Sequence, residues 1–96
     1  MVKYQIRTIN NFDRKYSKLI KKVNILKQIR KTVNQLERDP FHKALRTHKV
    51  NTATFGKRYA SFVTGDIRII WDFVDENTII VILTIGGHEG KNAVYK

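Results

Sequence analysis

The spacing of the apolar residues changes midway along the chain, and this change constrains the fold more than any other feature of the sequence. Between residues 12 and 36, apolar side chains recur at every third or fourth position, the period of a helix with one buried face. From residue 57 onward, short runs of β-branched and aromatic residues are separated by turn residues, a pattern typical of strands. Helices therefore precede most of the sheet, which indicates an α+β fold rather than regular alternation of strands and helices.

The predicted N-terminal elements have recognisable beginnings and ends. Residues 4–8 alternate between apolar and polar side chains and predict a first strand. Asn10-Asn11 offers capping side chains to the helical segment, Asn24 interrupts its rhythm, and Asp39-Pro40 ends it. We expect two helices that form a hairpin, or one long helix with a break near Asn24.

The second half of the chain predicts three further strands, over residues 57–64, 67–74 and 78–85. Gly65-Asp66 and residues 75–77 separate them with turn chemistry. Residues 79–83 are apolar on both faces, so the last strand is expected in the interior of the sheet.

Residues 41–56 show no clear period and are expected to form a loop between the helices and the sheet. A chain of 96 residues is too short for two cores, so we predict a single domain over residues 1–96. The predicted architecture has two layers, in which the N-terminal strand and the helical hairpin pack on an antiparallel sheet of about four strands.

The composition excludes several classes of protein. The chain has no cysteine, which rules out a disulfide framework and thiolate zinc sites. Its three histidines show no paired spacing, so we expect no metal site, and nothing indicates a small-molecule cofactor. The sequence shows no apolar segment of signal-peptide or membrane-span length, and we therefore expect a cytoplasmic protein without a membrane partner.

The positive charge is concentrated in one half of the chain. Residues 1–49 carry the whole net charge of +11, because they hold 14 Lys and Arg against three acidic residues. Residues 50–96 hold five basic and five acidic residues and have no net charge. A domain this basic attracts polyanions. The asymmetry favours nucleic acid or an acidic protein as the partner.

A hairpin register predicts where the chemistry lies. If residues 75–77 form a tight turn, the residue numbers of paired positions sum to about 152 or 153, which places Arg68 opposite Thr84 or Ile85 and Asp66 opposite Gly86 or Gly87. His88 would then lie just beyond the strand end, within reach of Arg68. The sequence therefore predicts a guanidinium, a carboxylate and an imidazole at one rim of the sheet, provided that the register holds.

Each of these residues also has a purely structural interpretation. His88 alone would more often be a surface histidine, and Asp66 fits a turn residue or a partner of Arg68. Tyr95 fits packing on the core or stacking on a base. His42 and His48, in the predicted loop, are candidates for a second proton-transfer group.

The predicted rim suits RNA cleavage without a metal, in which the ribose 2′-hydroxyl attacks the adjacent phosphate. This reaction needs a base, an acid and positive charge around the phosphorane. Histidine serves for either proton transfer, and arginine supplies a forked cation that does not titrate. Lys49, Lys57 and Arg58 are candidates for holding flanking phosphates, as is Lys91.

The C-terminal third resembles a known group of proteins. Residues 64–71 (TGDIRIIW), residues 82–88 (ILTIGGH) and Val94-Tyr95 resemble the RelE/YafQ group of type II toxins, and the order of the other elements is similar to theirs. The resemblance implies a RelE-like fold and cleavage of messenger RNA in the ribosomal A site, beside 16S rRNA. It also implies a cognate antitoxin that blocks the active site.

The resemblance also assigns roles to residues. His88 and Asp66 match the catalytic histidine and a functional aspartate of the YafQ branch, and His48 falls near a loop histidine of that branch. Arg68 matches the phosphate-stabilising arginine of the RelE branch, and Tyr95 its C-terminal tyrosine. On this basis His88 is the predicted proton donor and Arg68 the predicted stabiliser.

This sequence also departs from the family pattern. The paired strand lysines of the RelE branch fall on Tyr59 and Ser61, and the second histidine of the YafQ branch falls on Phe62. The spacing from His88 to Tyr95 is longer than in most relatives. The general base therefore stays open between Asp66 and His48.

Two other functions compete with the ribonuclease. A ParE-like toxin of the same fold would bind DNA gyrase and perform no chemistry, although a gyrase poison needs no imidazole at His88. A non-catalytic RNA-binding module would need the positive charge alone.

Overall fold

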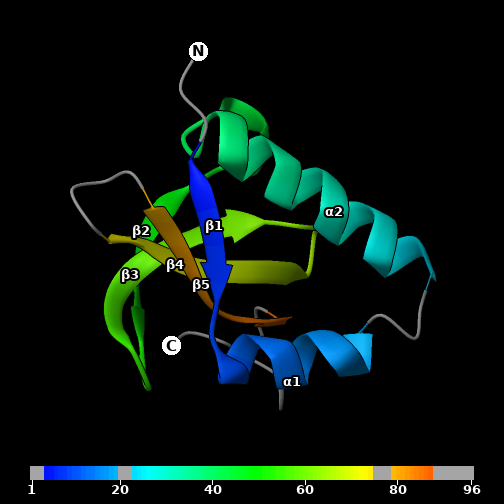
Figure 1. The fold of residues 1–96 in the computed structure, drawn as a ribbon, viewed down its shortest axis with the longest axis horizontal. Helices are drawn as coiled ribbons and strands as arrows, with labels where there is room; N and C mark the ends of the chain where they lie inside the picture. Colours follow the sequence, from blue (N-terminus) through cyan, green and yellow to red (C-terminus); the bar gives the residue numbers. More distant parts are fainter. Residues whose placement is uncertain (1–3, 20–22, 75–78, 88–96) are drawn as a thin grey trace.

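The computed structural model describes residues 4–19, 23–74 and 79–87, and these form two layers, with helices on one side of a twisted sheet (Figure 1). The elements in chain order are β1 (Gln5–Thr8), α1 (Asn10–Leu19), α2 (Val23–Arg38), a short 3-10 helix η1 (Lys43–Leu45), β2 (His48–Thr52), β3 (Gly56–Phe62), β4 (Ile67–Val74) and β5 (Ile79–Gly87). The predicted α+β fold is confirmed. The helical segment is two helices, and Asn24 lies inside the second.

The sheet has five strands in the order β1-β5-β4-β3-β2, so the count of about four was one too few. β5 lies in the interior, as its apolar faces predict. β1 pairs with β5 in parallel, which corrects the expectation of an entirely antiparallel sheet. β2 lies within the predicted loop, because this edge strand is mostly exposed and shows no apolar alternation. Its pairing with β3 is a property of two segments together and cannot be seen in its own sequence.

A β-bulge changes the predicted register between β4 and β5. Next to the turn, Val74 pairs with Ile79, as predicted. The register then shifts between Ile70 and Trp71, because Leu83 is an extra residue in β5. Beyond the bulge, Arg68 pairs with Gly86 instead of Thr84 or Ile85.

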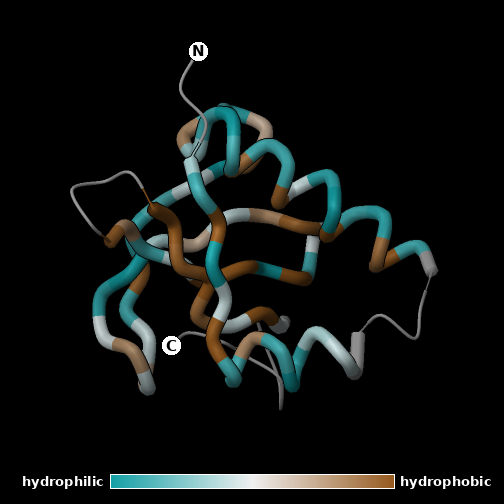
Figure 2. Tube along the Cα trace, viewed as in Figure 1, coloured by the Kyte–Doolittle hydropathy of each residue, from teal (hydrophilic) through white to brown (hydrophobic). Residues whose placement is uncertain are grey.

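Most of the core lies between the helices and the sheet. Trp71, Ile69 and Ile80 from the sheet and Leu36 from α2 are fully buried there. Figure 2 shows the corresponding pattern, with hydrophobic stretches along the central strands and alternating polar and apolar segments along the helices. A smaller apolar cluster around Ile70 lies on the other face, which we call the distal face. None of the described helices is long and apolar enough to cross a membrane.

A chain of buried and half-buried polar side chains fastens the segment after α2 to the sheet. Trp71 Nε1 donates to Ser61 Oγ (2.7 Å), and Thr47 Oγ1 donates to the carbonyl oxygen of Pro40 (2.6 Å). Ser61 Oγ and Thr47 Oγ1 lie 2.6 Å apart. Since the Thr47 proton is directed to Pro40, the Ser61 hydroxyl donates to Thr47. The order of donors is therefore Trp71, Ser61, Thr47, and the final acceptor is Pro40.

We predict that Ser61→Ala lowers the free energy of unfolding by about 1–3 kcal/mol, because it leaves the buried Trp71 N–H without its acceptor. Urea denaturation should show a lower midpoint with an unchanged slope. Ser17→Ala is the matched control, since the Ser17 hydroxyl bonds to Asp13 O on the exposed surface of α1. Equal midpoints for Ser61→Ala and the wild type would contradict a stabilising role for the hydroxyl chain.

Candidate functional site

Arg68 is the second residue of β4, and its charged side chain is held inside the sheet. The side chain is 6% exposed, and its guanidinium carbon lies 3.4 Å from the centre of the Phe62 ring. Phe62 is its cross-strand partner on β3. Stacking on an aromatic face at this distance is a favourable cation–π contact. The position of Arg68 is therefore set by strand pairing and by the ring beside it.

The turn between β3 and β4 holds one end of the guanidinium. Arg68 Nη1 donates to the carbonyl oxygens of Thr64 (2.9 Å), Gly65 (3.1 Å) and Ile67 (3.3 Å). Thr64 Oγ1 in turn accepts from the backbone N–H groups of Asp66 and Ile67, which fixes the turn. Three carbonyl groups thus converge on a single nitrogen.

Nε lies on the opposite edge of the same guanidinium from Nη1. Arg68 Nε is buried, and it makes no hydrogen bond within the part of the chain that the structure describes. Nε and Nη2 form the side-on fork with which arginine binds carboxylates and phosphates. Buried charges are normally paired, so a cation that is held by carbonyls and a ring and has no carboxylate partner among the described residues is suited to receive an oxyanion.

Phe62 also contacts two side chains from the η1–β2 segment. The Arg46 guanidinium carbon lies 5.4 Å from the centre of the Phe62 ring, and the His48 ring packs edge-on at 6.4 Å. Thr47 lies between them and is fastened by the hydroxyl chain. The structure therefore brings Arg46, His48 and Arg68 together around one aromatic ring.

The backbone sets the tautomer of His48. Arg46 ends η1 in the left-handed conformation (φ 49°), and its carbonyl oxygen lies 2.8 Å from His48 Nδ1. A carbonyl can only accept, so Nδ1 carries the proton in the neutral ring and the basic lone pair lies on Nε2. In this tautomer Nε2 is the ring nitrogen that can accept a proton.

Asp66 lies outside the contacts of Arg68. It is exposed in the turn before β4, not opposite Gly86 or Gly87, because the bulge pairs those residues with Arg68 and Ile67. The guanidinium donates to carbonyl oxygens and not to this carboxylate. Asp66 therefore occupies a turn position, the first of the two structural roles open to it.

The bulge also changes what faces Arg68 from β5. Gly86 presents no side chain, whereas the predicted register would have placed Thr84 or the bulky Ile85 there. Thr84 instead pairs with Ile70, and its buried hydroxyl has no hydrogen-bond partner among the described residues. One extra residue in β5 thus places a glycine opposite Arg68, and it leaves the Thr84 hydroxyl without a partner among the described residues.

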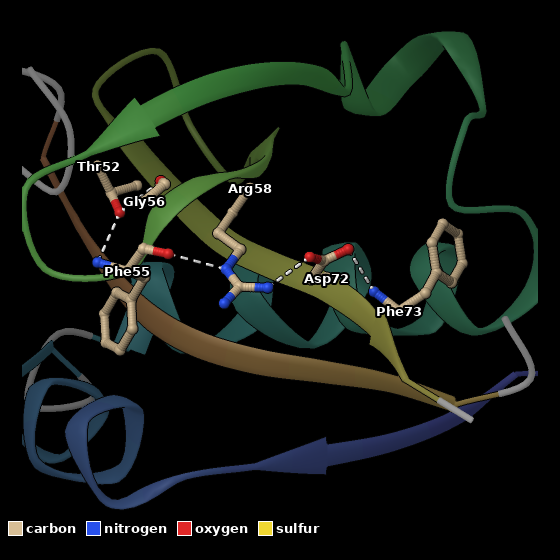
Figure 3. Close-up of polar contacts among 6 residues, drawn as sticks. All are labelled: Thr52, Phe55, Gly56, Arg58, Asp72 and Phe73. Carbon is tan, nitrogen blue, oxygen red and sulfur yellow. Dashed lines mark hydrogen bonds and ion pairs between the residues drawn. The ribbon is translucent and has the colours of Figure 1, made fainter. Parts of the chain in front are cut away.

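The proposed phosphate-binding residues of the β2–β3 hairpin are not equivalent. Arg58 Nη1 lies 2.6 Å from Asp72 Oδ2, and Arg58 Nε donates to Phe55 O at 3.0 Å (Figure 3). Its charge is therefore paired across β3 and β4. Lys49 and Lys57 are exposed, and the Lys49 ammonium lies 5.9 Å from the centre of the Tyr59 ring. Both lysines remain available to a polyanion, whereas Arg58 has a structural partner.

Hydrogen bonds of one side chain fix the turn between β2 and β3. Thr52 Oγ1 accepts from Phe55 N and donates to Gly56 O, both at 2.8 Å (Figure 3). Gly56 has a positive φ of 75°, which favours glycine. The turn holds Phe55, whose carbonyl binds Arg58, in place.

The remaining positions divide into two groups. His88, Lys91 and Tyr95 lie outside the described residues. Tyr59 and Ser61, the positions of the lysine pair in the RelE branch, belong to the helix-facing side of β3, where both contact Trp71. Neither can act together with Arg68 on the distal face.

Two members of the cluster were not predicted as site residues, namely Arg46 and Phe62. The turn at Gly65-Asp66 could have revealed Phe62, because a short hairpin there pairs residues near 62 with Arg68. Arg46 had no such signal, since its position depends on η1 and β2. No group of three or more His, Asp or Glu residues suited to a metal occurs in residues 4–19, 23–74 and 79–87.

The fold and this basic cluster agree with a known class of proteins, the toxins of type II toxin–antitoxin systems. Residues 4–91 match the family model described as the ParE toxin of the type II toxin–antitoxin system parDE. The chain belongs to this family, which confirms the resemblance at the level of the RelE/ParE superfamily. No curated protein sequence matches the chain.

Solved structures of similar fold include both RelE and YafQ toxins. A chain of the RelBE2 toxin–antitoxin complex from Mycobacterium tuberculosis is 24% identical, with a TM-score of 0.67 over 90% of this chain and 99% of that one. A chain of the archaeal RelE–RelB complex from Pyrococcus horikoshii is 16% identical, with a TM-score of 0.70 over 90% of this chain and 96% of that one. YafQ from E. coli is 13% identical, with a TM-score of 0.68 over 88% of this chain and 92% of that one. At these identities the likeness concerns the fold.

We predict that Phe62→Leu releases the Arg68 guanidinium without unfolding the protein, because the Phe62 side chain is only half-buried. The Arg68 Nε proton should exchange slowly with solvent in the wild type and markedly faster in the variant, as measured by NMR. Phe41→Leu is the control, since Phe41 packs against Tyr59 and Trp71 on the helix-facing side. Unchanged exchange in Phe62→Leu would show that the ring does not hold Arg68.

Proposed function

We propose that this toxin is a metal-independent endoribonuclease that cuts messenger RNA in the ribosomal A site. Within the cytoplasm, a cognate antitoxin would block the distal face of the sheet, where Arg68 lies. Several of the related structures are complexes of a toxin with its antitoxin, which supports a protein partner of this kind. The net charge of +11 suits contact with messenger RNA and with 16S rRNA.

The proposal rests on one observation, namely that the buried Arg68 Nε has no hydrogen-bond partner among the described residues. The turn carbonyls and Phe62 hold the guanidinium in a fixed orientation before any substrate binds. A preorganised cation stabilises the charge that develops on a phosphorane at no cost of reorganisation during the reaction. Arg68 is therefore the proposed ligand of the non-bridging phosphate oxygens.

His48 is the proposed general base. Its Nε2 would take the proton of the ribose 2′-hydroxyl as the 2′-oxygen forms a bond to phosphorus. The bond from phosphorus to the 5′-oxygen then breaks, and His88 would protonate that oxygen. The products are a 2′,3′-cyclic phosphate and a free 5′-hydroxyl. Asp66, the alternative base, is less well placed because it lies in the turn and not beside Phe62.

The family model also supports a second function, inhibition of DNA gyrase without chemistry, because the model is that of ParE toxins. Translating ribosomes and gyrase assays separate the two. Cut messenger with intact DNA supports the nuclease, and DNA breaks with intact messenger support gyrase inhibition. Binding of RNA without either product would leave a plain RNA-binding module.

We predict that Arg68→Ala lowers the rate of messenger cleavage by about 10²-fold or more, as for the loss of one preorganised donor at a developing oxyanion. Arg68→Lys should recover only part of the rate, because lysine keeps the charge but loses the fork. The readout is primer extension on messenger from a purified translation system. Arg38→Ala, at the exposed end of α2, serves as the control. Undiminished cleavage by Arg68→Ala would remove Arg68 from the phosphate site.

We predict that His48→Ala and His88→Ala each lower cleavage by about 10²–10⁴-fold, but for different reasons. A messenger with sulfur in place of the scissile 5′-oxygen has a leaving group that needs no proton. This substrate should rescue His88→Ala and leave His48→Ala slow.

His42→Ala is the matched control, because the His42 ring only caps η1 by accepting from Ala44 N. If Asp66→Ala were slow on both substrates and His48→Ala were not, Asp66 would be the base. Rescue of neither histidine variant would remove His88 as the proton donor.

A further inference from the structure

A cavity of about 410 Å³ adjoins the candidate site. It lies between α2, η1 and the turn that joins β3 to β4. Arg46 and Phe62 line this cavity, and the same two residues belong to the cluster around Arg68. The cavity and the cluster therefore share Arg46 and Phe62, the last residue of β3.

One stripe of α2 forms a wall of the cavity. Gln28, Lys31, Thr32 and Gln35 recur at intervals of three, one and three residues and so share one side of the helix. The neighbouring stripe, with Ile29 and Leu36, is buried in the core and fixes the rotation of the helix. Thr32 Oγ1 also donates to Phe62 O (3.2 Å), which joins this wall to the strand that carries the site.

The polar groups of the cavity are of a particular kind. Gln28 and Gln35 each offer both donors and an acceptor, and the cations come from Lys31 and Arg46. Leu45 and Val63 supply apolar surface between them. The described lining contains no carboxylate.

We infer that this cavity binds the nucleotide next to the scissile phosphate, with its base between α2 and η1. This inference rests on the proposed ribonuclease function and assigns sequence preference to that same site. The carboxamides would pair with the edge of the base, as Asn and Gln do in nucleic-acid readout, and the apolar surface would cover its face. Arg46 and Lys31 would hold the phosphates on either side.

The dimensions and chemistry favour a nucleotide over an acidic peptide. Seven residues of helix separate Gln28 from Gln35, a distance of about 10 Å along the axis, which exceeds the width of one base and suits a base with its ribose. An acidic peptide presents mainly carboxylates, and cationic side chains alone would suffice to bind them. Carboxamides are suited to a ligand that carries both donors and acceptors, as every base does.

Direct binding tests the cavity independently of cleavage. The four nucleoside 5′-monophosphates, added singly to the full-length protein, should perturb NMR signals of η1, of the β3–β4 turn and of the Gln28 side of α2, with unequal affinities for the four bases. Gln28→Ala/Gln35→Ala should weaken the preferred nucleotide about tenfold, the loss expected for two net hydrogen bonds. Asn24→Ala/Asn34→Ala, which removes two exposed carboxamides of α2 outside this cavity, should not. Absent binding, or equal binding by the two double variants, would overturn the inference.

Cleavage patterns distinguish this inference from the proposed function. On translated messengers, Gln28→Ala/Gln35→Ala should lose the base preference at one position beside the cut, because cutting at the preferred sequences falls toward the rate at the other sequences. If the wild type cuts and the double variant keeps its preference, the cavity inference is wrong and the nuclease stands. If the wild type cuts no RNA, the proposed function is wrong, and the mononucleotide titration alone decides whether the cavity binds nucleotides.

Discussion

The contact between Arg68 and Phe62 is the interaction on which the candidate site depends. A guanidinium inside a sheet is costly unless something compensates its lost hydration. Here a cross-strand ring lies 3.4 Å from its central carbon and three turn carbonyls bind one nitrogen, so the charge is held without an anionic partner among the described residues. Because the same ring contacts Arg46 and His48, the stack that stabilises the cation also gathers the other groups of the site.

Strand β3 links the stability of the protein to this site through two adjacent residues. Ser61 points toward the helices and belongs to the hydroxyl chain that fastens Thr47. Phe62 points to the distal face and contacts the side chains on either side of Thr47. The alternation of a strand thus lets one segment serve both purposes. A change that loosens the core at Ser61 would therefore also shift His48 and Arg46.

The sequence predicts the parts of this protein that depend on one segment at a time. The period of α2, the turn at Gly65-Asp66 and the buried interior strand were all visible, because local propensity and burial determine them. β2, the parallel pairing of β1 and the bulge at Leu83 depend on two segments together and were missed. Arg68 was found because an arginine in an apolar strand needs a partner, but the partner is a ring and a turn rather than Asp66. Arg46 had no local signal at all.

Membership of the ParE toxin family and the proposed nuclease activity are compatible, because this fold carries its function in a few side chains and not in its topology. A toxin that acted only by covering a protein surface would gain little from a buried cation, since exposed charges serve that purpose without desolvation. The buried edge of Arg68 makes sense when its partner is an anion that arrives during the reaction. The bulge also places Gly86 rather than Ile85 opposite Arg68, so that this position of β5 presents no side chain to the guanidinium. A cation without an anionic partner among the described residues would gain one when the proposed oxyanion binds.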